Sequence, residues 1–239
     1  MRLTILGMNG PFPAPGGATS GYFLAAGETN IALDLGCGTL ARLTALTPPE
    51  ELTALLLSHW HYDHCSDVLP MIFRLEACAT KPLHIYAPAD ENALVRKAVL
   101  GCGKIVLHDV HPGETFTVGE MQVTAFAARH PVPAVMYRIE GEGKTFCYTG
   151  DTNTVEGLAD FARNADFLLA DGLFTDSTWA ESKPHLSAAH VAQLAKDADV
   201  RRFVITHLNP AIDPETQLRQ ARAVRIDALL ARAGDSYEV

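Results

Sequence analysis

Four side chains that bind transition metals occur within six consecutive residues of this chain. The segment His59-Trp60-His61-Tyr62-Asp63-His64 follows the pattern H-x-H-x-D-H. The types, order and spacing of these residues match a site for two metal ions, whereas the alternative interpretation is a polar loop that is rich in histidine by chance. Imidazole and carboxylate together favour Zn, Mn or Fe over Mg or Ca. The segment therefore predicts metal-dependent chemistry.

The neighbouring residues predict the elements that position this motif. Residues 52–58 form an apolar run typical of a short buried strand. Residues 68–75 resemble a helix, in which Pro70 is tolerated because it lies near the start. The motif then occupies a loop at the carboxyl end of a strand, where sheet proteins commonly place ligand sites. If this loop is extended, its first two histidines point the same way toward one ion, and the following Asp and His turn toward a second.

The motif resembles that of the metallo-β-lactamase superfamily of hydrolases, and the rest of the chain supplies the further ligands that this family needs. His130 follows a strand-like run, Asp151 follows another within a Thr-Gly-Asp-Thr sequence, and His207 follows a third. Each of these residues alone has a structural explanation; His130, for example, could be a polar strand end before Pro131. The combination supports the resemblance, which extends from the region of Asp34 to His207.

This resemblance implies a centre of two divalent transition-metal ions, with zinc as the first choice and manganese or iron as alternatives. It also implies how the ligands divide between the two ions. The expected ligands are His59, His61 and His130 for the first metal, Asp63, His64 and His207 for the second, and Asp151 as the bridge between them.

The order of predicted elements suits an α+β fold, namely the four-layer αββα sandwich that the family implies. No linker or low-complexity segment divides the chain, so we expect one domain over residues 1–239. Hairpins are expected at residues 26–28 and 140–143, and Ser187 is a candidate helix N-cap. The predicted strands are 2–6, 21–26, 30–34, 53–57, 83–86, 115–118, 121–127, 134–140, 144–149, 166–170 and 202–206. The predicted helices are 39–46, 65–77, 90–99, 154–163, 187–198 and 214–232.

The expected reaction is hydrolysis by a metal-activated hydroxide, for which Asp63 orients the hydroxide and accepts its proton. Asp171 and His185 resemble the carboxylate–histidine pair that protonates the leaving group in ribonuclease Z relatives, with Asp in place of the usual Glu. A carboxylate beside imidazole favours the protonated ring, which suits a general acid. The structural alternative is that Asp171 forms a turn and His185 lies in a surface loop.

Several features weaken the resemblance to ribonuclease Z as a tRNA-processing enzyme. Residues 131–150 leave no room for the protruding arm that binds tRNA in that family, and Leu208-Asn209-Pro210 replaces its usual sequence after the last histidine. The formal charge of −9, from 28 acidic and 19 basic residues, disfavours extensive contact with a polyanion. We therefore expect a small-molecule or nucleotide phosphodiester as substrate. The alternatives are tRNA 3′ processing, ester or lactone hydrolysis, and, outside the enzymes, a non-catalytic metal-binding sensor.

A glycine-rich segment, residues 33–39, supports a competing hypothesis. Leu-Asp-Leu-Gly-Cys-Gly-Thr resembles the turn with which S-adenosylmethionine-dependent methyltransferases approach their cofactor. Leu40 occupies the position of the next expected glycine, and a turn of this kind also connects strand and helix in metallo-β-lactamase relatives. The metal motif is the stronger of the two patterns.

The remaining residue types bound the setting. The five cysteines are odd in number and form no C-x-x-C pair, so we expect them to be reduced in a cytoplasmic protein. No signal peptide or membrane-spanning stretch is evident. The resemblance implies a possible homodimer. Trp60, Tyr62 and Trp179 are candidates for stacking on a base, with packing as the alternative. His84, His108, His111 and His190 are expected in structural or surface roles.

Overall fold

The computed structural model describes residues 1–239 and contains two seven-stranded sheets. The first sheet has the order β14-β1-β2-β3-β4-β5-β6 and the second the order β13-β12-β11-β10-β9-β8-β7. The strands of the first sheet are β1 (Arg2–Gly7), β2 (Gly21–Ala26), β3 (Thr29–Leu35), β4 (Ala54–Leu56), β5 (Leu83–Ala87), β6 (Ile105–Asp109) and β14 (Ser236–Glu238). Those of the second are β7 (Thr115–Val118), β8 (Met121–Ala127), β9 (Val135–Gly141), β10 (Lys144–Tyr148), β11 (Phe167–Asp171), β12 (Arg202–Thr206) and β13 (Leu229–Leu230).

The two sheets share one plan, in which an antiparallel part continues into a parallel part. Strands β3 to β6 run parallel in the first sheet, and β10 to β13 run parallel in the second. Parallel neighbours need crossover connections, and most of these contain helices. The helices of the first half are α1 (Thr39–Leu43), the 3-10 turn η1 (Pro49–Glu51), α2 (Tyr62–Cys65), α3 (Val68–Cys78) and α4 (Leu94–Leu100). Those of the second half are α5 (Leu158–Ala162), α6 (Ala188–Asp197) and α7 (Pro214–Val224).

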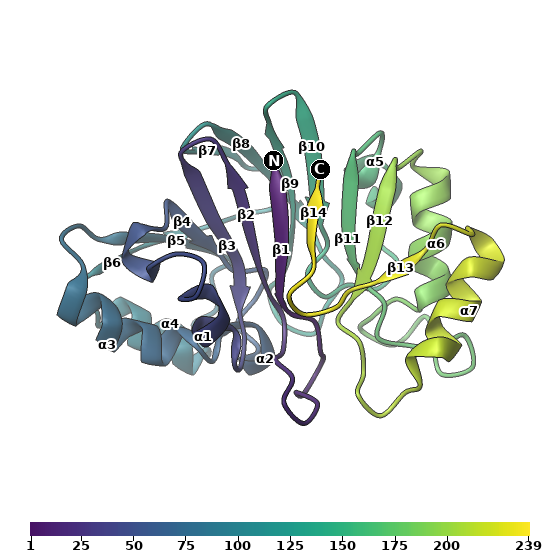
Figure 1. Cartoon of the computed structure of the whole chain (residues 1–239), viewed down its shortest axis with the longest axis horizontal. Helices are drawn as coiled ribbons and strands as arrows, with labels where there is room; N and C mark the ends of the chain where they lie inside the picture. Colours follow the sequence, from purple (N-terminus) through teal and green to yellow (C-terminus); the bar gives the residue numbers. More distant parts are fainter.

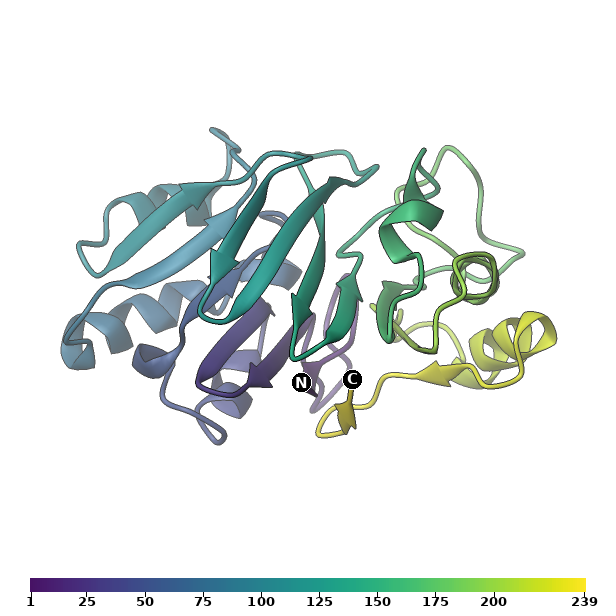
Figure 2. The ribbon, with the colours of Figure 1, turned by 90° about the horizontal axis from the view of Figure 1, so that it is seen from above.

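Alternate residues of the central strands face different cores, as the two-residue period of a strand requires. In β11, Phe167 and Leu169 belong to the core between the sheets, whereas Leu168 and Ala170 pack beneath the helices. The inter-sheet core is the largest, with 24 buried residues, against 21 and 18 in the two cores that join a sheet to its helices. Helices α1, α3 and α4 lie outside one sheet and α6 and α7 outside the other (Figures 1 and 2). The expectation of an αββα sandwich is confirmed.

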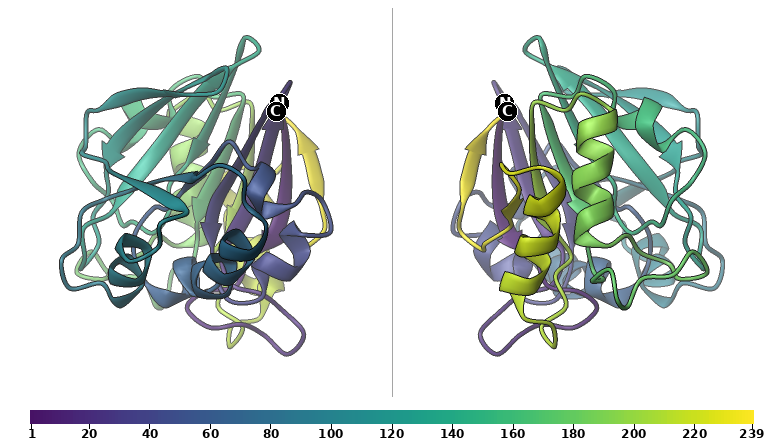
Figure 3. Two further views of the ribbon diagram at one scale, coloured as in Figure 1. Left: turned by 90° about the vertical axis from the view of Figure 1, so that its left-hand side faces the viewer. Right: turned by 90° about the vertical axis from the view of Figure 1, so that its right-hand side faces the viewer.

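Both ends of the chain meet at the edge of the first sheet. Strand β14 pairs antiparallel with β1, and the two termini lie side by side in every view (Figures 1 and 3). None of the helices is long and apolar enough to cross a membrane. The five cysteines form no disulfide.

Most predicted elements are confirmed, but the helix expected over 214–232 is wrong. Helix α7 ends at Val224, and Arg225 is extended because its guanidinium donates hydrogen bonds to the carbonyl groups of Ala195 and Val200. The chain then adds β13 to the edge of the second sheet. Strands β6, β13 and β14 were not expected from the sequence. The helix expected over 65–77 is α3, which begins three residues later, and the short helix α2 before it was not expected. Helices α1, α4 and α5 are shorter than expected.

Candidate metal centre

The H-x-H-x-D-H motif lies in the loop after β4, and this loop begins with extended backbone, as expected from the sequence. His61 has extended backbone angles, with φ −66° and ψ 147°, and the helical turn α2 begins at the next residue. The side chains of His59 and His61 therefore project from an extended segment, whereas those of Asp63 and His64 project from a helical turn. His59 and His64 are almost completely buried, so these two side chains point into the molecule.

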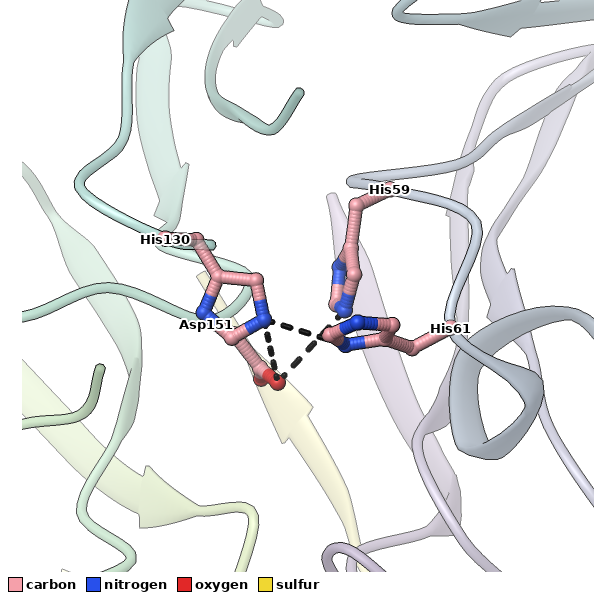
Figure 4. A group of neighbouring side chains, drawn as sticks. All are labelled: His59, His61, His130 and Asp151. Carbon is pink, nitrogen blue, oxygen red and sulfur yellow. Dashed lines mark hydrogen bonds and ion pairs between the residues drawn. The ribbon is translucent and has the colours of Figure 1, made fainter. Parts of the chain in front are cut away.

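His59, His61, His130 and Asp151 form a first group of potential metal ligands. One ligand atom from each lies within 4.8 Å of the others. Asp151 Oδ2 is 3.6 Å from His59 Nε2 and 4.0 Å from His130 Nε2, and His130 Nε2 is 3.0 Å from His61 Nδ1 (Figure 4). The side chains come from the loops after β4, β8 and β10, and they converge on a common point.

Asp63, His64, His207 and Asp151 form a second group, again with one ligand atom of each within 4.8 Å of the others. Asp151 Oδ1 is 3.2 Å from His64 Nε2 and 3.4 Å from His207 Nδ1, and Asp63 Oδ2 is 3.8 Å from His207 Nε2. The two oxygens of Asp151 thus face different groups. The structure brings all seven expected ligands together. Asp151 and His207 also lie within 4.8 Å of Asp171 and His185, in a third group.

The hydrogen bonding of these groups fits a cation. The buried atoms His59 Nε2, Asp63 Oδ2, His64 Nε2, Asp151 Oδ1 and His207 Nε2 have no hydrogen-bond partner. An unsatisfied buried polar group costs about 1–3 kcal/mol, and such groups are few in native proteins. Five that face one another are accounted for if divalent ions bind there.

The electrostatic environment also fits a cation. Burial lowers the pKa of His59 and of His207 well below the usual value, so both rings are neutral as metal ligation requires. Burial raises the pKa of Asp63 to about 6, and the charge of Asp151 adds to this effect. Burial would lower the pKa of His64, but the carboxylates of Asp151 and Asp63 raise it well above the usual value. His64 would therefore lose a proton on binding a divalent ion, whose charge would offset the repulsion between the two carboxylates.

Asp34, which the sequence did not single out as a site residue, supports His64 from behind. Its Oδ2 accepts a hydrogen bond from His64 Nδ1 at 2.7 Å and from the Tyr148 hydroxyl at 2.5 Å. Ser58 donates to the same carboxylate through its backbone N–H at 2.7 Å and its hydroxyl at 2.8 Å. Asp34 is completely buried at the end of an apolar strand. A carboxylate in that position fixes the orientation and tautomer of a ligating histidine.

Two serines contact ring nitrogens of other candidate ligands. Ser58 Oγ lies 3.0 Å from His59 Nδ1, and Ser20 Oγ lies 3.0 Å from His207 Nδ1. With Asp34, these contacts give three of the candidate ligands a hydrogen-bond partner at Nδ1, whereas Nε2 of each has none. Serine is too common in loops for its sequence position to reveal this role.

Asp171 and His185 lie together beside the centre. His185 Nδ1 is 2.7 Å from Asp171 Oδ2 and 3.9 Å from Asp151 Oδ2. Asp171 is fully buried and His185 nearly so, so neither is a surface loop residue. Burial would lower the pKa of His185, but the Asp171 carboxylate raises it to about 9, which favours the protonated ring. The placement suits the pair that the sequence suggested for proton transfer.

The glycine-rich turn at residues 33–39 packs against the metal motif. A Cβ at Gly36 would overlap the backbone carbonyl of Asp63, and Gly38 has a φ of 82°, which favours glycine. Gly10 lies against the ring of His207 in the same way. These glycines permit close packing around the candidate ligands, which explains the segment without a methyltransferase cofactor.

Two of the aromatic residues suggested for base stacking are engaged within the protein. Trp60 is buried and donates its indole N–H to the Pro88 carbonyl at 2.7 Å. Trp179 stacks on His190, with 4.0 Å between the ring centroids. Tyr62 is 61% exposed and is the one of the three that is free to meet a ligand.

Comparisons with known proteins agree with this fold and site. Residues 29–208 match the family model described as "Beta-lactamase superfamily domain". The chain therefore belongs to the metallo-β-lactamase superfamily of hydrolases. It is 28% identical over 215 residues to "Probable metallo-hydrolase YhfI" of Bacillus subtilis, covering 87% of each chain. It is also 26% identical to "Ribonuclease Z" of Haloferax volcanii, covering 100% of this chain and 95% of the relative.

Solved structures show the same similarity. The crystal structure of the YhfI protein superposes with a TM-score of 0.93 at 27% identity, covering 100% of this chain and 98% of that one. Human tRNase Z, short form, superposes with a TM-score of 0.82 at 19% identity, covering 100% and 99%. At that identity the second comparison concerns the fold alone.

Proposed function

We propose that this chain is a phosphodiesterase that uses two divalent transition-metal ions, zinc first and manganese or iron as alternatives. The observation that carries the proposal is the pair of ligand groups that share Asp151, with five buried ligand atoms left without partners. We assign His59, His61 and His130 to one ion, Asp63, His64 and His207 to the other, and Asp151 to both. Two metal ions at such a site lower the pKa of a water molecule that they share, and their positive charge offsets the negative charge that develops on a phosphoryl group.

Asp63 is the candidate base in this proposal. Its Oδ2 lies between candidate ligands, 3.6 Å from His64 Nε2 and 3.8 Å from His207 Nε2, and has no hydrogen-bond partner. A carboxylate oxygen in that position orients the attacking water and accepts its proton. Asp63 therefore combines a binding role with a proton-transfer role.

His185 is the candidate acid for the leaving group, and Asp171 positions it. The hydrogen bond of 2.7 Å between His185 Nδ1 and Asp171 Oδ2 fixes the ring and stabilises its protonated form. The second ring nitrogen is then able to donate a proton to the departing oxygen. A phosphodiester with a poor leaving group needs this donation most.

A phosphodiester is favoured as substrate by the relative that is named a ribonuclease, because ribonucleases cleave such bonds. Transfer RNA is less favoured as substrate. Strands β9 and β10 are joined by a tight turn at Glu142–Gly143, so the hairpin before Asp151 carries no protruding arm. Together with the net charge of −9, this supports a small or nucleotide phosphodiester.

An activity screen of the metal-loaded protein tests the proposal. It compares bis(p-nitrophenyl) phosphate, a cyclic nucleotide, precursor tRNA, p-nitrophenyl acetate and a lactone. We expect turnover of the phosphodiesters, and we expect Asp151→Ala to lose both metal and turnover. The control is Asp166→Ala, which removes a carboxylate paired with Lys144 at 2.8 Å at the far end of β11. Bound metal without hydrolysis in any assay would favour a sensor, and turnover of esters alone would favour an esterase.

A further inference from the structure

An open cavity of about 330 Å³ adjoins the candidate metal centre. Arg129, His130 and Pro131 line one side, and residues 181–184 line the other. His130 belongs both to this cavity and to the first ligand group, so the cavity lies directly beside that group. A substrate whose reacting bond lies at the metal centre could therefore place another of its groups in this cavity.

Two half-buried cations of this cavity lack carboxylate partners. The Arg129 guanidinium donates a hydrogen bond to the backbone carbonyl of Glu181, and the Lys183 ammonium donates to that of Thr178. Neither forms an ion pair, although the side chain of Glu181 also lines the cavity. Backbone carbonyls do not neutralise these charges. In a chain with a net charge of −9, the pair forms a local region that attracts anions.

Both walls of the cavity are fixed to the segment that carries Asp151. The backbone N–H of Arg129 donates to Thr152 Oγ1 at 2.9 Å, and that of Asn153 donates to the Arg129 carbonyl at 3.2 Å. The buried Asn153 side chain donates to the carbonyl groups of Ala180 and of Lys183 in the opposite wall, at 3.1 and 2.7 Å. Its Oδ1 also accepts a hydrogen bond from the indole N–H of Trp179 at 3.1 Å. The backbone on either side of the cavity is therefore held in place relative to the metal centre, which reduces the cost of binding there.

We propose that Arg129 and Lys183 form a subsite for a second anionic group of the substrate, such as a phosphate on the nucleoside attached to the reacting diester. This rests on the proposed function and narrows it to phosphodiesters that carry an additional phosphate. Guanidinium binds phosphate oxygens through paired N–H groups, and ammonium adds a point charge. On binding, the phosphate replaces the two backbone carbonyls as the acceptor of these hydrogen bonds.

A matched pair of substrates tests the subsite. Thymidine 5′-(p-nitrophenyl phosphate) and its 3′-phosphorylated form differ only in the added phosphate. The wild-type protein is expected to show the higher kcat/KM for the 3′-phosphorylated form. Arg129→Gln and Lys183→Gln should each reduce this preference by about tenfold, the effect of losing one hydrogen bond to a charged group. The preference is the ratio of the two kcat/KM values, so an effect of either substitution that is common to both substrates cancels from it.

Two further variants control for general electrostatics and for folding. Lys104→Gln removes a half-buried ammonium that donates to the Ala79 carbonyl at 2.9 Å in another part of the fold, and it should leave the preference unchanged. Glu181→Gln removes the negative charge at the cavity and should increase the preference. Thermal unfolding of each variant identifies any loss of the fold.

Binding measurements separate failure of this subsite from failure of the proposed function. Calorimetry compares thymidine 3′,5′-bisphosphate with thymidine 5′-monophosphate as ligands of the metal-loaded protein. If neither diester is hydrolysed, tighter binding of the bisphosphate that is lost in Arg129→Gln still supports the subsite and contradicts only the phosphodiesterase assignment. Equal preference in the wild-type protein, Arg129→Gln and Lys183→Gln, in both kinetics and binding, overturns the subsite.

Discussion

Two groups of histidines in this chain differ in what surrounds their ring nitrogens. On β5 and β6, His84 Nδ1 lies 2.8 Å from His108 Nε2, the rings stack, and both side chains reach solvent. In the candidate metal centre, Nε2 of His59, His64 and His207 is buried without any partner. Close imidazoles therefore do not by themselves define a metal site. The difference lies in burial, in missing hydrogen-bond partners and in the carboxylates that accompany the buried group.

His185 sharpens this comparison because it is a buried histidine with a carboxylate partner of its own. In His185→Ala, both metals should remain bound while turnover falls by about 10²–10⁴-fold on a diester with a poor leaving group, the usual contribution of an acid catalyst. The loss should be smaller on bis(p-nitrophenyl) phosphate, whose leaving group needs little protonation. Steady-state kinetics on the two substrates, together with metal analysis, check this. Equal losses on both substrates would exclude the acid role.

Removal of metal should lower the thermal stability of the protein through the candidate metal centre and not through His84 and His108. Ligand at about a thousand times its dissociation constant adds about 4 kcal/mol to the free energy of unfolding. We therefore expect a chelator to lower the Tm of the wild-type protein and added zinc to restore it. This zinc dependence should be reduced in His59→Ala, which removes a ligand of one of the two ions, and unchanged in His84→Ala. Scanning calorimetry with and without chelator measures both, and an undiminished zinc dependence in His59→Ala would argue against the proposed site.

Asp34→Asn tests the support behind His64 with little change in volume. The variant loses the carboxylate that accepts from His64 Nδ1, and such changes typically reduce metal affinity by about 10–100-fold. Competition with a chromophoric chelator gives the zinc affinity. Asp109→Asn is the control, because Asp109 is a partly exposed carboxylate paired with Arg96 at 2.9 Å. Equal zinc affinity in the two variants would show that Asp34 has no supporting role.

Substitution in the solvent-exposed pair His84 and His108 should have the smallest effect of these variants, and that effect is on stability. Burial and the neighbouring His84 lower the pKa of His108, so protonation costs more in the folded protein than in the unfolded chain. This contribution to stability is complete above the unfolded value of about 6.5 and is lost as the pH falls below it. His84→Ala should therefore weaken the fall in stability between about pH 7 and pH 5, and its effect at neutral pH should stay within about 0.5 kcal/mol. Urea unfolding across this pH range measures it, and an unchanged pH dependence would contradict the coupling.

The sequence predicted those parts of the site that depend on local order. His59 to His64 lie close together in the sequence, and the family resemblance then indicated His130, Asp151 and His207, each of which follows a predicted strand. The αββα layers followed from the order of the predicted strands and helices and from the family resemblance.

What the sequence did not reveal depends on contacts between distant segments. Asp34 reaches His64 because β3 pairs with β4, and no local sequence pattern predicts that pairing. The end of α7 at Val224 depends on hydrogen bonds from Arg225 to carbonyl groups 25 and 30 residues away. Strands β13 and β14 have two and three residues, too few for a periodic pattern.

Anomalous X-ray diffraction from crystals grown with zinc, measured above and below the zinc absorption edge, tests the two-ion site directly. We expect two peaks separated by about 3.5–4 Å on either side of Asp151, the first among His59, His61 and His130 and the second among Asp63, His64 and His207. A single peak, or peaks at His84 and His108 with none beside Asp151, would contradict the shared two-metal centre.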